Sequence, residues 1–206
     1  IHGITGSGKT EVYMDLIDYT IKKGKSVIVL IPEIALTYQT VMRFTRRFKE
    51  KVSIINSRLS SGERYDQFER AKNGDVNIMI GPRSALFTPF SNLGLIVIDE
   101  EHESAYKSES VPKYHAIEVA QKRAYDTGAT VVLGSATPSL ESYYKAKNGT
   151  YILHKLTTRE KGNLPSVSIV DLREELQQGN KSIFSNKLIY KLARLCIINC
   201  VLQIIA

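Results

Sequence analysis

The stretch Gly3-Ile4-Thr5-Gly6-Ser7-Gly8-Lys9-Thr10 decides the fold that this sequence predicts. It fits the pattern G-x-x-x-x-G-K-T, in which glycines let successive backbone N–H groups turn toward one anion. We expect a helix to begin near Lys9, so that its positive end adds to this cradle. Lys9 would reach the β- and γ-phosphate oxygens of a nucleotide, and the Thr10 hydroxyl would bind Mg²⁺. The pattern therefore predicts a phosphate-binding loop over residues 3–10.

Short apolar runs follow this loop at regular intervals. They are rich in β-branched residues, as strands buried on both faces are, and they cover residues 27–31, 52–55, 76–80, 95–98 and 131–133. Segments with helical spacing lie between them, at residues 11–23, 37–51, 62–73, 114–127 and 140–147. Because strands alternate with helices, we expect an α/β fold with a mainly parallel sheet and helices on both faces.

Acidic residues follow the apolar run at 95–98, in the order Asp99-Glu100-Glu101-His102. Ligands of open α/β sheets bind at the carboxyl ends of the strands, where these acids would lie. We expect Asp99 to hold Mg²⁺ through its water shell and Glu100 to orient and deprotonate the water that attacks the γ-phosphate. An acidic cluster after a strand is often only a solvated loop, but its place after a phosphate loop favours a Walker B strand. Lys9, Asp99 and Glu100 are thus the predicted catalytic residues.

A third motif, Gly134-Ser135-Ala136-Thr137-Pro138, follows the run at 131–133. The hydroxyls of Ser135 and Thr137 can hydrogen-bond the acids or His102 and so couple the state of the nucleotide to the rest of the protein. The same residues also suit an ordinary helix start, with proline near the first turn. In combination with Asp-Glu-Glu-His, the motif matches the signature of superfamily 2 helicases.

Six blocks in the same order resemble the bacterial replication-restart helicases of the PriA family, also called primosomal protein N′. The blocks are residues 3–13 (GITGSGKTEVY), 32–37 (PEIALT), 59–64 (LSSGER), 81–87 (GPRSALF), 92–103 (NLGLIVIDEEHE) and 134–142 (GSATPSLES). The resemblance covers residues 1 to about 160 and implies a RecA-like P-loop NTPase lobe. It further implies an ATP-dependent 3′→5′ DNA helicase that acts in replication restart and primosome assembly in the bacterial cytoplasm.

The resemblance also assigns DNA contacts to three segments. The residues are Pro32, Thr37, Arg83, Ser84, Tyr106 and Lys107. Thr37 would in addition cap the helix that follows it. In an aromatic-rich loop that couples DNA binding to hydrolysis, Tyr106 would stack on bases and Lys107 would contact a phosphate.

The partners that the resemblance implies are single-stranded and forked DNA, other primosomal proteins and single-stranded DNA-binding protein, with no membrane. ATP and Mg²⁺ are the expected cofactors. Zinc is expected in the full-length family but not in this segment, because the two cysteines, Cys196 and Cys200, are too few for a four-thiolate site. The net charge of +7 suits a polyanionic partner, but Lys181, Lys187, Lys191 and Arg194 supply four of those charges after the last acid.

We expect two parts in the chain. Residues 1–160 would form the first helicase lobe, with most of its first strand missing because Ile1 and His2 alone precede the loop, and the isolated chain would then be marginally stable. Residues 161–206 would form a linker and the truncated start of a second lobe, with a strand at 167–170. Since the second lobe supplies transition-state charge in such motors, we expect the segment to turn over poorly by itself. A nucleotide- or DNA-binding segment that does not hydrolyse ATP, or another superfamily 2 DNA translocase, are the alternatives.

Overall fold

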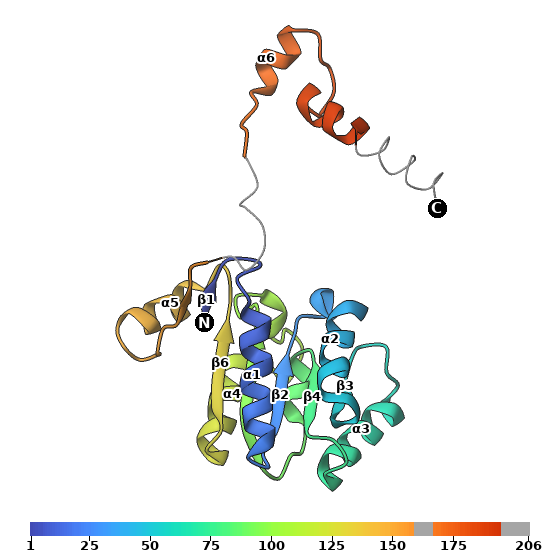
Figure 1. The fold of residues 1–206 in the computed structure, drawn as a ribbon, viewed down its shortest axis with the longest axis vertical. Helices are drawn as coiled ribbons and strands as arrows, with labels where there is room; N and C mark the ends of the chain where they lie inside the picture. Colours follow the sequence, from blue (N-terminus) through green and yellow to red (C-terminus); the bar gives the residue numbers. More distant parts are fainter. Residues whose placement is uncertain (159–166, 195–206) are drawn as a thin grey trace. The chain divides into compact units, whose positions relative to one another are not determined.

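The computed structural model describes residues 1–158 and 167–194 and divides into two units, Ile1–Gly162 and Asn163–Ala206. In the first unit, five parallel strands stand in the order β3-β4-β2-β5-β6 (Figure 1). Their bounds are β2 Ser26–Leu30, β3 Val52–Ile54, β4 Ile78–Gly81, β5 Leu93–Asp99 and β6 Thr130–Gly134. The predicted parallel sheet is confirmed.

Helices cover both faces of this sheet. Helices α1 (Lys9–Lys22) and α2 (Tyr38–Phe48) pack on one face, and α3 (Ser61–Asn73) and α4 (Ala116–Thr127) pack on the other. Alternate residues of the strands therefore enter two different cores: Val27 and Val29 of β2 join the first, and Ile28 and Leu30 join the second. Burial on both sides explains why the strands are continuous apolar runs and not alternating ones.

Two very short strands continue the parallel order beyond β6. Strand β1 (His2–Gly3) pairs with β7 (Lys155–Leu156), and the Gly3 amide donates to the Ser135 carbonyl, 3.1 Å away, at the end of β6. Helix α5 (Leu140–Lys147) lies between β6 and β7 in the sequence. The phosphate loop therefore begins at β1, in a two-stranded sheet beside the end of β6, and leads directly into α1.

Short 3₁₀ turns occur where the chain leaves a strand or a helix. They are Glu33–Ala35 after β2, Lys49–Lys51 after α2, Arg83–Phe87 after β4 and Ser104–Tyr106 after β5. Three of them lie at the carboxyl ends of strands. They carry the segments that the resemblance assigns to DNA.

In the second unit, the described residues 167–194 contain α6 (Leu172–Gln177) and a helical stretch at 186–194. The strand expected at 167–170 is wrong, because no strand is present among these described residues to pair with it and Ile169 is 97% exposed. The apolar end of the chain, including Cys196 and Cys200, lies outside the described residues. No helix among the described residues is long and apolar enough to cross a membrane.

Candidate nucleotide-binding and hydrolysis site

The phosphate loop connects β1 to α1 and leaves polar groups without partners. Gly6 and Gly8 have φ values of 80° and 86°, in the left-handed region that favours glycine. Among the α-helices with described caps, α1 is the one that lacks a side-chain cap, since Gly8 stands at its start. The Ser7 hydroxyl is buried with no hydrogen-bond partner. An anion bound in the loop would satisfy these groups, so the residues fit a nucleotide phosphate.

Lys9 contributes a buried ammonium group. Its Nζ donates to the Gly3 carbonyl, 2.8 Å away, and it takes part in none of the ion pairs formed within residues 1–158 and 167–194. A buried cation whose partner is a neutral carbonyl gains strongly from a nearby anion. The ammonium group of Lys9 therefore lies at the loop, and its contact with phosphate stays a prediction.

Asp99 ends β5 and lies between two buried tyrosines. The Tyr13 hydroxyl of α1 donates to Asp99 Oδ1 at 3.1 Å, and the Tyr106 hydroxyl donates to the Asp99 carbonyl at 2.6 Å. Burial, and then the charge of Glu100, raises the pKa of the Asp99 carboxyl above its usual 3.8. Burial and the charge of Asp99 also raise the pKa of both tyrosines, so they remain proton donors at neutral pH. Tyr13 was not among the residues predicted from the sequence, although it lies one helical turn after Lys9.

The end of β6 approaches Tyr13 so closely that only glycine fits there. A Cβ built on Gly134 would lie 1.6 Å from the Tyr13 hydroxyl and 2.7 Å from its ring carbon Cζ. Gly134 thus allows a tyrosine from α1 to reach Asp99 past the neighbouring strand.

The structure brings together the three residues predicted to couple nucleotide state to the rest of the protein. His102 Nδ1 shares a hydrogen bond of 2.7 Å with Ser135 Oγ, and His102 Nε2 lies 3.4 Å from Thr137 Oγ1. Glu100 Oε2 is 3.7 Å from His102 Nδ1. Glu100 has a φ of 47°, a strained conformation for a residue with a side chain.

Glu101, to which the sequence analysis gave no role, is the buried acid of the motif. Its carboxylate accepts hydrogen bonds from the Ser139 amide at 2.8 Å and from the Ser142 hydroxyl at 2.9 Å. Two serines three residues apart at a helix start were the available signal, because a carboxylate is a common partner for such a start.

The predicted DNA contacts at 32–37 need a partial correction. Thr37 is exposed and caps α2 as expected, its hydroxyl accepting from the Thr40 amide at 3.3 Å. Pro32 is buried, so its ring offers no surface to a nucleic acid. Ile34 and Tyr38 are instead the exposed large side chains of this segment.

Arg83 and Tyr106 also differ from expectation. Arg83 Nη1 donates to the carbonyls of Ala105 and Lys107, at 2.8 and 3.0 Å, so this guanidinium holds the 3₁₀ turn that carries Tyr106. Tyr106 is 1% exposed, and its hydroxyl donates to two strand-end carbonyls. The prediction that Tyr106 stacks on bases is therefore wrong for this structure, because its ring lies in the core.

Besides Thr37, two further predicted DNA contacts retain accessible side chains. Ser84 is half-buried and Lys107 is exposed. Next to them, Phe87 is half-exposed and packs edge-to-face against Tyr114, with 5.3 Å between the ring centroids. This aromatic pair, which the sequence analysis did not single out, joins the 83–87 turn to the segment after Lys107.

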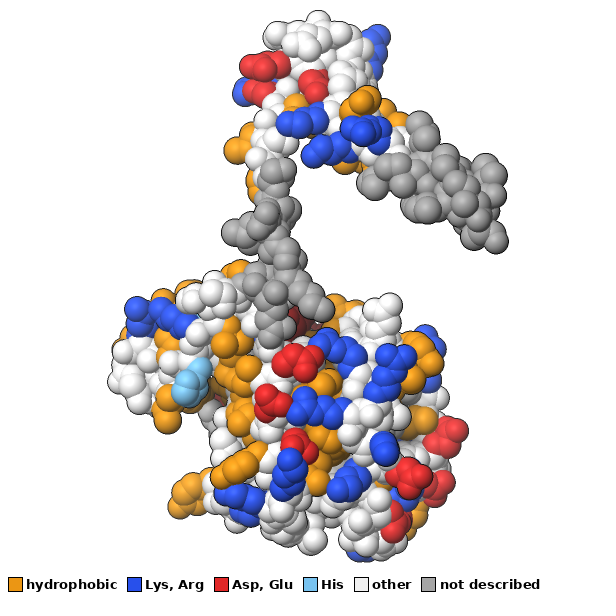
Figure 2. Space-filling model, in the orientation of Figure 1, with side chains coloured by type: hydrophobic (Ala, Val, Ile, Leu, Met, Phe, Trp, Pro, Cys, Tyr) orange, Lys and Arg blue, Asp and Glu red, His pale blue; other side chains and the backbone are white. Residues whose placement is uncertain are grey.

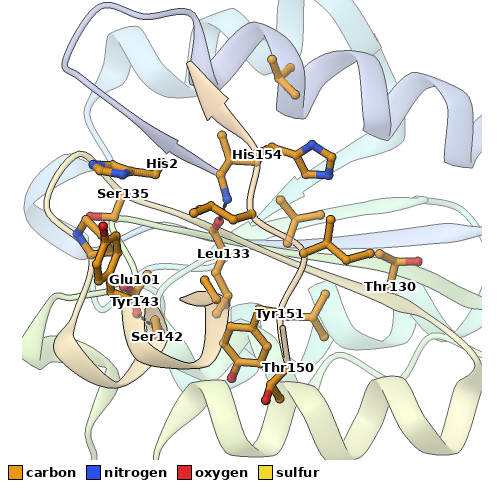
Figure 3. A pocket seen from close by; sticks show the side chains of 18 of the residues that line it. His2, Glu101, Thr130, Leu133, Ser135, Ser142, Tyr143, Thr150, Tyr151 and His154 are labelled. Atoms are coloured by element: carbon orange, nitrogen blue, oxygen red, sulfur yellow. Dashed lines mark hydrogen bonds between the residues drawn. The ribbon is translucent and has the colours of Figure 1, made fainter. Parts of the chain in front are cut away.

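A cavity of about 690 Å³ lies beside β1 and not at the phosphate loop. Figure 3 shows its lining, which runs along β6 from Thr130 to Ser135 and past Tyr151 and His154. Its other walls come from α1 and α5. Within the described residues, no group of three or more His, Cys, Asp or Glu side chains gathers as a metal site.

Helices α1 and α2 are joined by surface ion pairs. Arg43 contacts Glu11 at 2.6 Å and Arg47 contacts Asp15 at 2.5 Å. Figure 2 shows acidic and basic side chains interleaved over these helices, so this face is not a patch of one charge. The pairs tie the 32–37 segment, through α2, to the helix that begins at the phosphate loop.

A RecA-like sheet, a phosphate loop between β1 and α1, and acids at the end of β5 define a P-loop NTPase lobe of the helicase type. The family model of the DEAD/DEAH box helicases matches residues 1–146, so the chain belongs to that family. Its resemblance to PriA is confirmed by replication restart protein PriA of Bacillus subtilis (strain 168), 53% identical over 193 residues, which are 93% of this chain and 24% of that protein. PriA of Synechocystis is 50% identical over 195 residues, covering 91% and 23%. The chain thus spans about a quarter of the length of these curated relatives.

Solved structures of helicases share the fold. The helicase domain of Pyrococcus furiosus Hef has a TM-score of 0.53 and 23% identity, covering 78% of this chain and 34% of that one. RecG bound to a three-way DNA junction has a TM-score of 0.54 and 22% identity, covering 76% and 20%. These likenesses establish the architecture of the first unit.

Proposed function

We propose that this chain is the ATP-binding lobe of a 3′→5′ DNA helicase of superfamily 2 that acts in replication restart and primosome assembly. The observation that carries the proposal is an anion-ready phosphate loop, with Lys9 buried in it, in one unit with Asp99 and Glu100. The names of the relatives support the role in replication restart, and the helicase family supports the use of ATP.

The phosphate loop would bind the β- and γ-phosphates. Lys9 would exchange its bond to the Gly3 carbonyl for phosphate oxygens, and the amides of residues 4–10 would donate to the same group. Thr10 and Asp99 would hold Mg²⁺, which when bound neutralises charge on the phosphate oxygens. Tyr13 would fix the Asp99 carboxylate, since it donates to Oδ1.

Glu100 would act as the base for the attacking water. It lies directly after Asp99 and is half-buried, so a water in line with the γ-phosphate can be held by its carboxylate. Through its hydrogen bonds, His102 would couple changes at the nucleotide to Ser135 and Thr137. Transition-state charge from a second lobe would still be needed for fast turnover, an effect of about 10³- to 10⁵-fold in other NTPases.

DNA would bind across the carboxyl ends of the strands. Thr37, Ser84 and Lys107 would contact the sugar–phosphate backbone of single-stranded or forked DNA, as polar and basic side chains do without reading sequence. Arg83 would act indirectly, through the turn whose carbonyls it binds. Other primosomal proteins and single-stranded DNA-binding protein are the proposed protein partners.

Steady-state MgATP hydrolysis by the purified chain, with and without single-stranded DNA, tests the proposal. Glu100→Gln is the control, because it keeps the shape of the acid and removes the base. We expect MgATP to bind and to protect the chain from thermal unfolding, with turnover that is slow and lost in Glu100→Gln. Failure of MgATP to bind, measured by fluorescence of a labelled ATP analogue, would refute the proposal.

The same assay separates the alternatives. Binding without hydrolysis at any DNA concentration would favour a nucleotide-responsive binding segment over a motor lobe. Lys107→Ala tests the proposed DNA contact. The affinity for labelled forked and single-stranded DNA, measured by fluorescence anisotropy, should fall, and the slope of log affinity against log salt concentration should decrease by about one.

A further inference from the structure

Glu101 is an unusual residue of the acid turn, which we define as residues 99–102. Its side chain is 3% exposed, and it joins none of the ion pairs among the described residues. A buried carboxylate without a cation is costly unless hydrogen bonds satisfy its oxygens. The hydrogen-bond donors that contact these oxygens must therefore offset the cost of burying the charge.

All of those groups belong to the start of α5. The Ser139 amide donates to Oε1 at 2.8 Å, and the hydroxyls of Ser139 and Ser142 donate to Oε2 at 3.1 and 2.9 Å. Ser139 is the cap of α5, so the carboxylate lies at the positive end of that helix. Figure 3 shows Glu101 beside Ser142 and Tyr143, with Ser135 next to them.

The backbone of Glu101 makes a second attachment. Its amide donates to the Gly134 carbonyl at 3.0 Å. The hydroxyl turn, which we define as residues 134–139, is thus held by Glu101 at both of its ends and by His102 in its middle. Because Glu101 stands between Glu100 and His102, its anchoring fixes the direction of both neighbours.

We propose that Glu101 is a positioning residue that locks the acid turn to α5, so that Glu100 and His102 keep their orientation during ATP hydrolysis. Glu100 needs such support, since its φ of 47° persists only where the surroundings impose it. The kinetic part of this inference rests on the proposed function. The geometric part, which concerns His102, does not.

Two substitutions of Glu101 separate positioning from simple packing. Glu101→Gln keeps an acceptor for the Ser139 amide and a second polar atom for the serine hydroxyls, whereas Glu101→Ala removes all three bonds. Losing a residue that orients catalytic groups costs about 10- to 100-fold in activity in comparable sites. We expect such a loss of kcat in Glu101→Ala with the KM for ATP within about threefold, because Lys9 binds phosphate elsewhere, and near-normal kcat in Glu101→Gln.

Glu141→Gln is the matched control. Glu141 is an exposed acid in the first turn of α5, so its loss removes a charge at the same helix start without touching the acid turn. It should leave kcat unchanged. If Glu101→Ala behaved like Glu141→Gln, the inference would be overturned.

A second readout does not need turnover. The ring carbon–proton NMR signals of His102, recorded without nucleotide at one pH, should move in Glu101→Ala and stay in place in Glu101→Gln and Glu141→Gln. If Glu101→Ala does not fold, Ser142→Ala, which removes one bond to Oε2, is measured instead. Unmoved His102 signals would overturn the inference whether or not the chain hydrolyses ATP, while absent hydrolysis with moved signals would count against the proposed function alone.

Discussion

Replacing Gly134 with alanine should destabilise the first unit strongly. The new methyl group would meet the Tyr13 hydroxyl at 1.6 Å and the ring carbon Cζ at 2.7 Å, and Tyr13 is fully buried. Overpacking of this kind costs about 1–3 kcal/mol. Displacing Tyr13 would also break its hydrogen bond to the Asp99 carboxylate, which is worth about 1.5–3 kcal/mol.

The two terms together predict a loss of about 2.5–6 kcal/mol in the free energy of unfolding. In a unit of this size that lowers Tm by roughly 5–24 °C. Thermal unfolding followed by circular dichroism measures the shift. Gly62→Ala is the control, because Gly62 lies in α3 with nothing within 4 Å of the added methyl, and it should raise stability by up to about 1 kcal/mol.

A double-mutant cycle with Tyr13→Phe tests the cause. Removing the hydroxyl relieves the closest clash, so the effects of Gly134→Ala and Tyr13→Phe should not add, and the cycle should show a coupling of at least about 1 kcal/mol. Additive effects, or a Gly134→Ala protein as stable as Gly62→Ala, would refute the steric argument. A Gly134→Ala protein that does not fold by itself but folds with Tyr13→Phe would support it.

Two further predictions concern pH and a helix cap. Because the pKa of Asp99 is raised, protons should compete with Mg²⁺ for this proposed ligand already above pH 3.8. The gain in ATP-analogue affinity that Mg²⁺ gives should therefore weaken above that pH as the solution is acidified. The folded chain also binds more protons than the unfolded chain between pH 3.8 and the raised pKa, so the free energy of unfolding should fall as pH rises through this range. Thr37→Ala should cost about 1 kcal/mol through the lost cap of α2, and Thr37→Ser should restore it, as unfolding midpoints would reveal.

Much of the site followed from one rule of parallel sheets. Strand ends meet at one edge, so the acids after β5 and the hydroxyls after β6 had to be neighbours, and the contact between His102 and Ser135 was predictable from their motifs. The prediction of a strand at 167–170 was wrong because an apolar run forms a strand only when another strand is there to pair with it.

The failures at Tyr106, Arg83 and Glu101 have a different origin. A motif indicates that a residue type is needed but not which of its atoms is engaged. Tyr106 has a ring that can stack and a hydroxyl that can donate, and the buried carbonyls of Leu30 and Asp99 require the donor. Glu101 resembled its acidic neighbours in sequence, and only the position of α5 distinguishes it from them.

The contacts of Arg83 change how a binding defect at that position should be interpreted. Weaker DNA binding after removal of the Arg83 charge would usually be explained by the loss of an ion pair with a DNA phosphate. In this protein the substitution would also release the carbonyls of Ala105 and Lys107, and with them the turn that places a tyrosine against Asp99. A substitution of Arg83 that weakens DNA binding would therefore also disturb the surroundings of Asp99, the acid that we propose as a Mg²⁺ ligand, and the two defects would occur together.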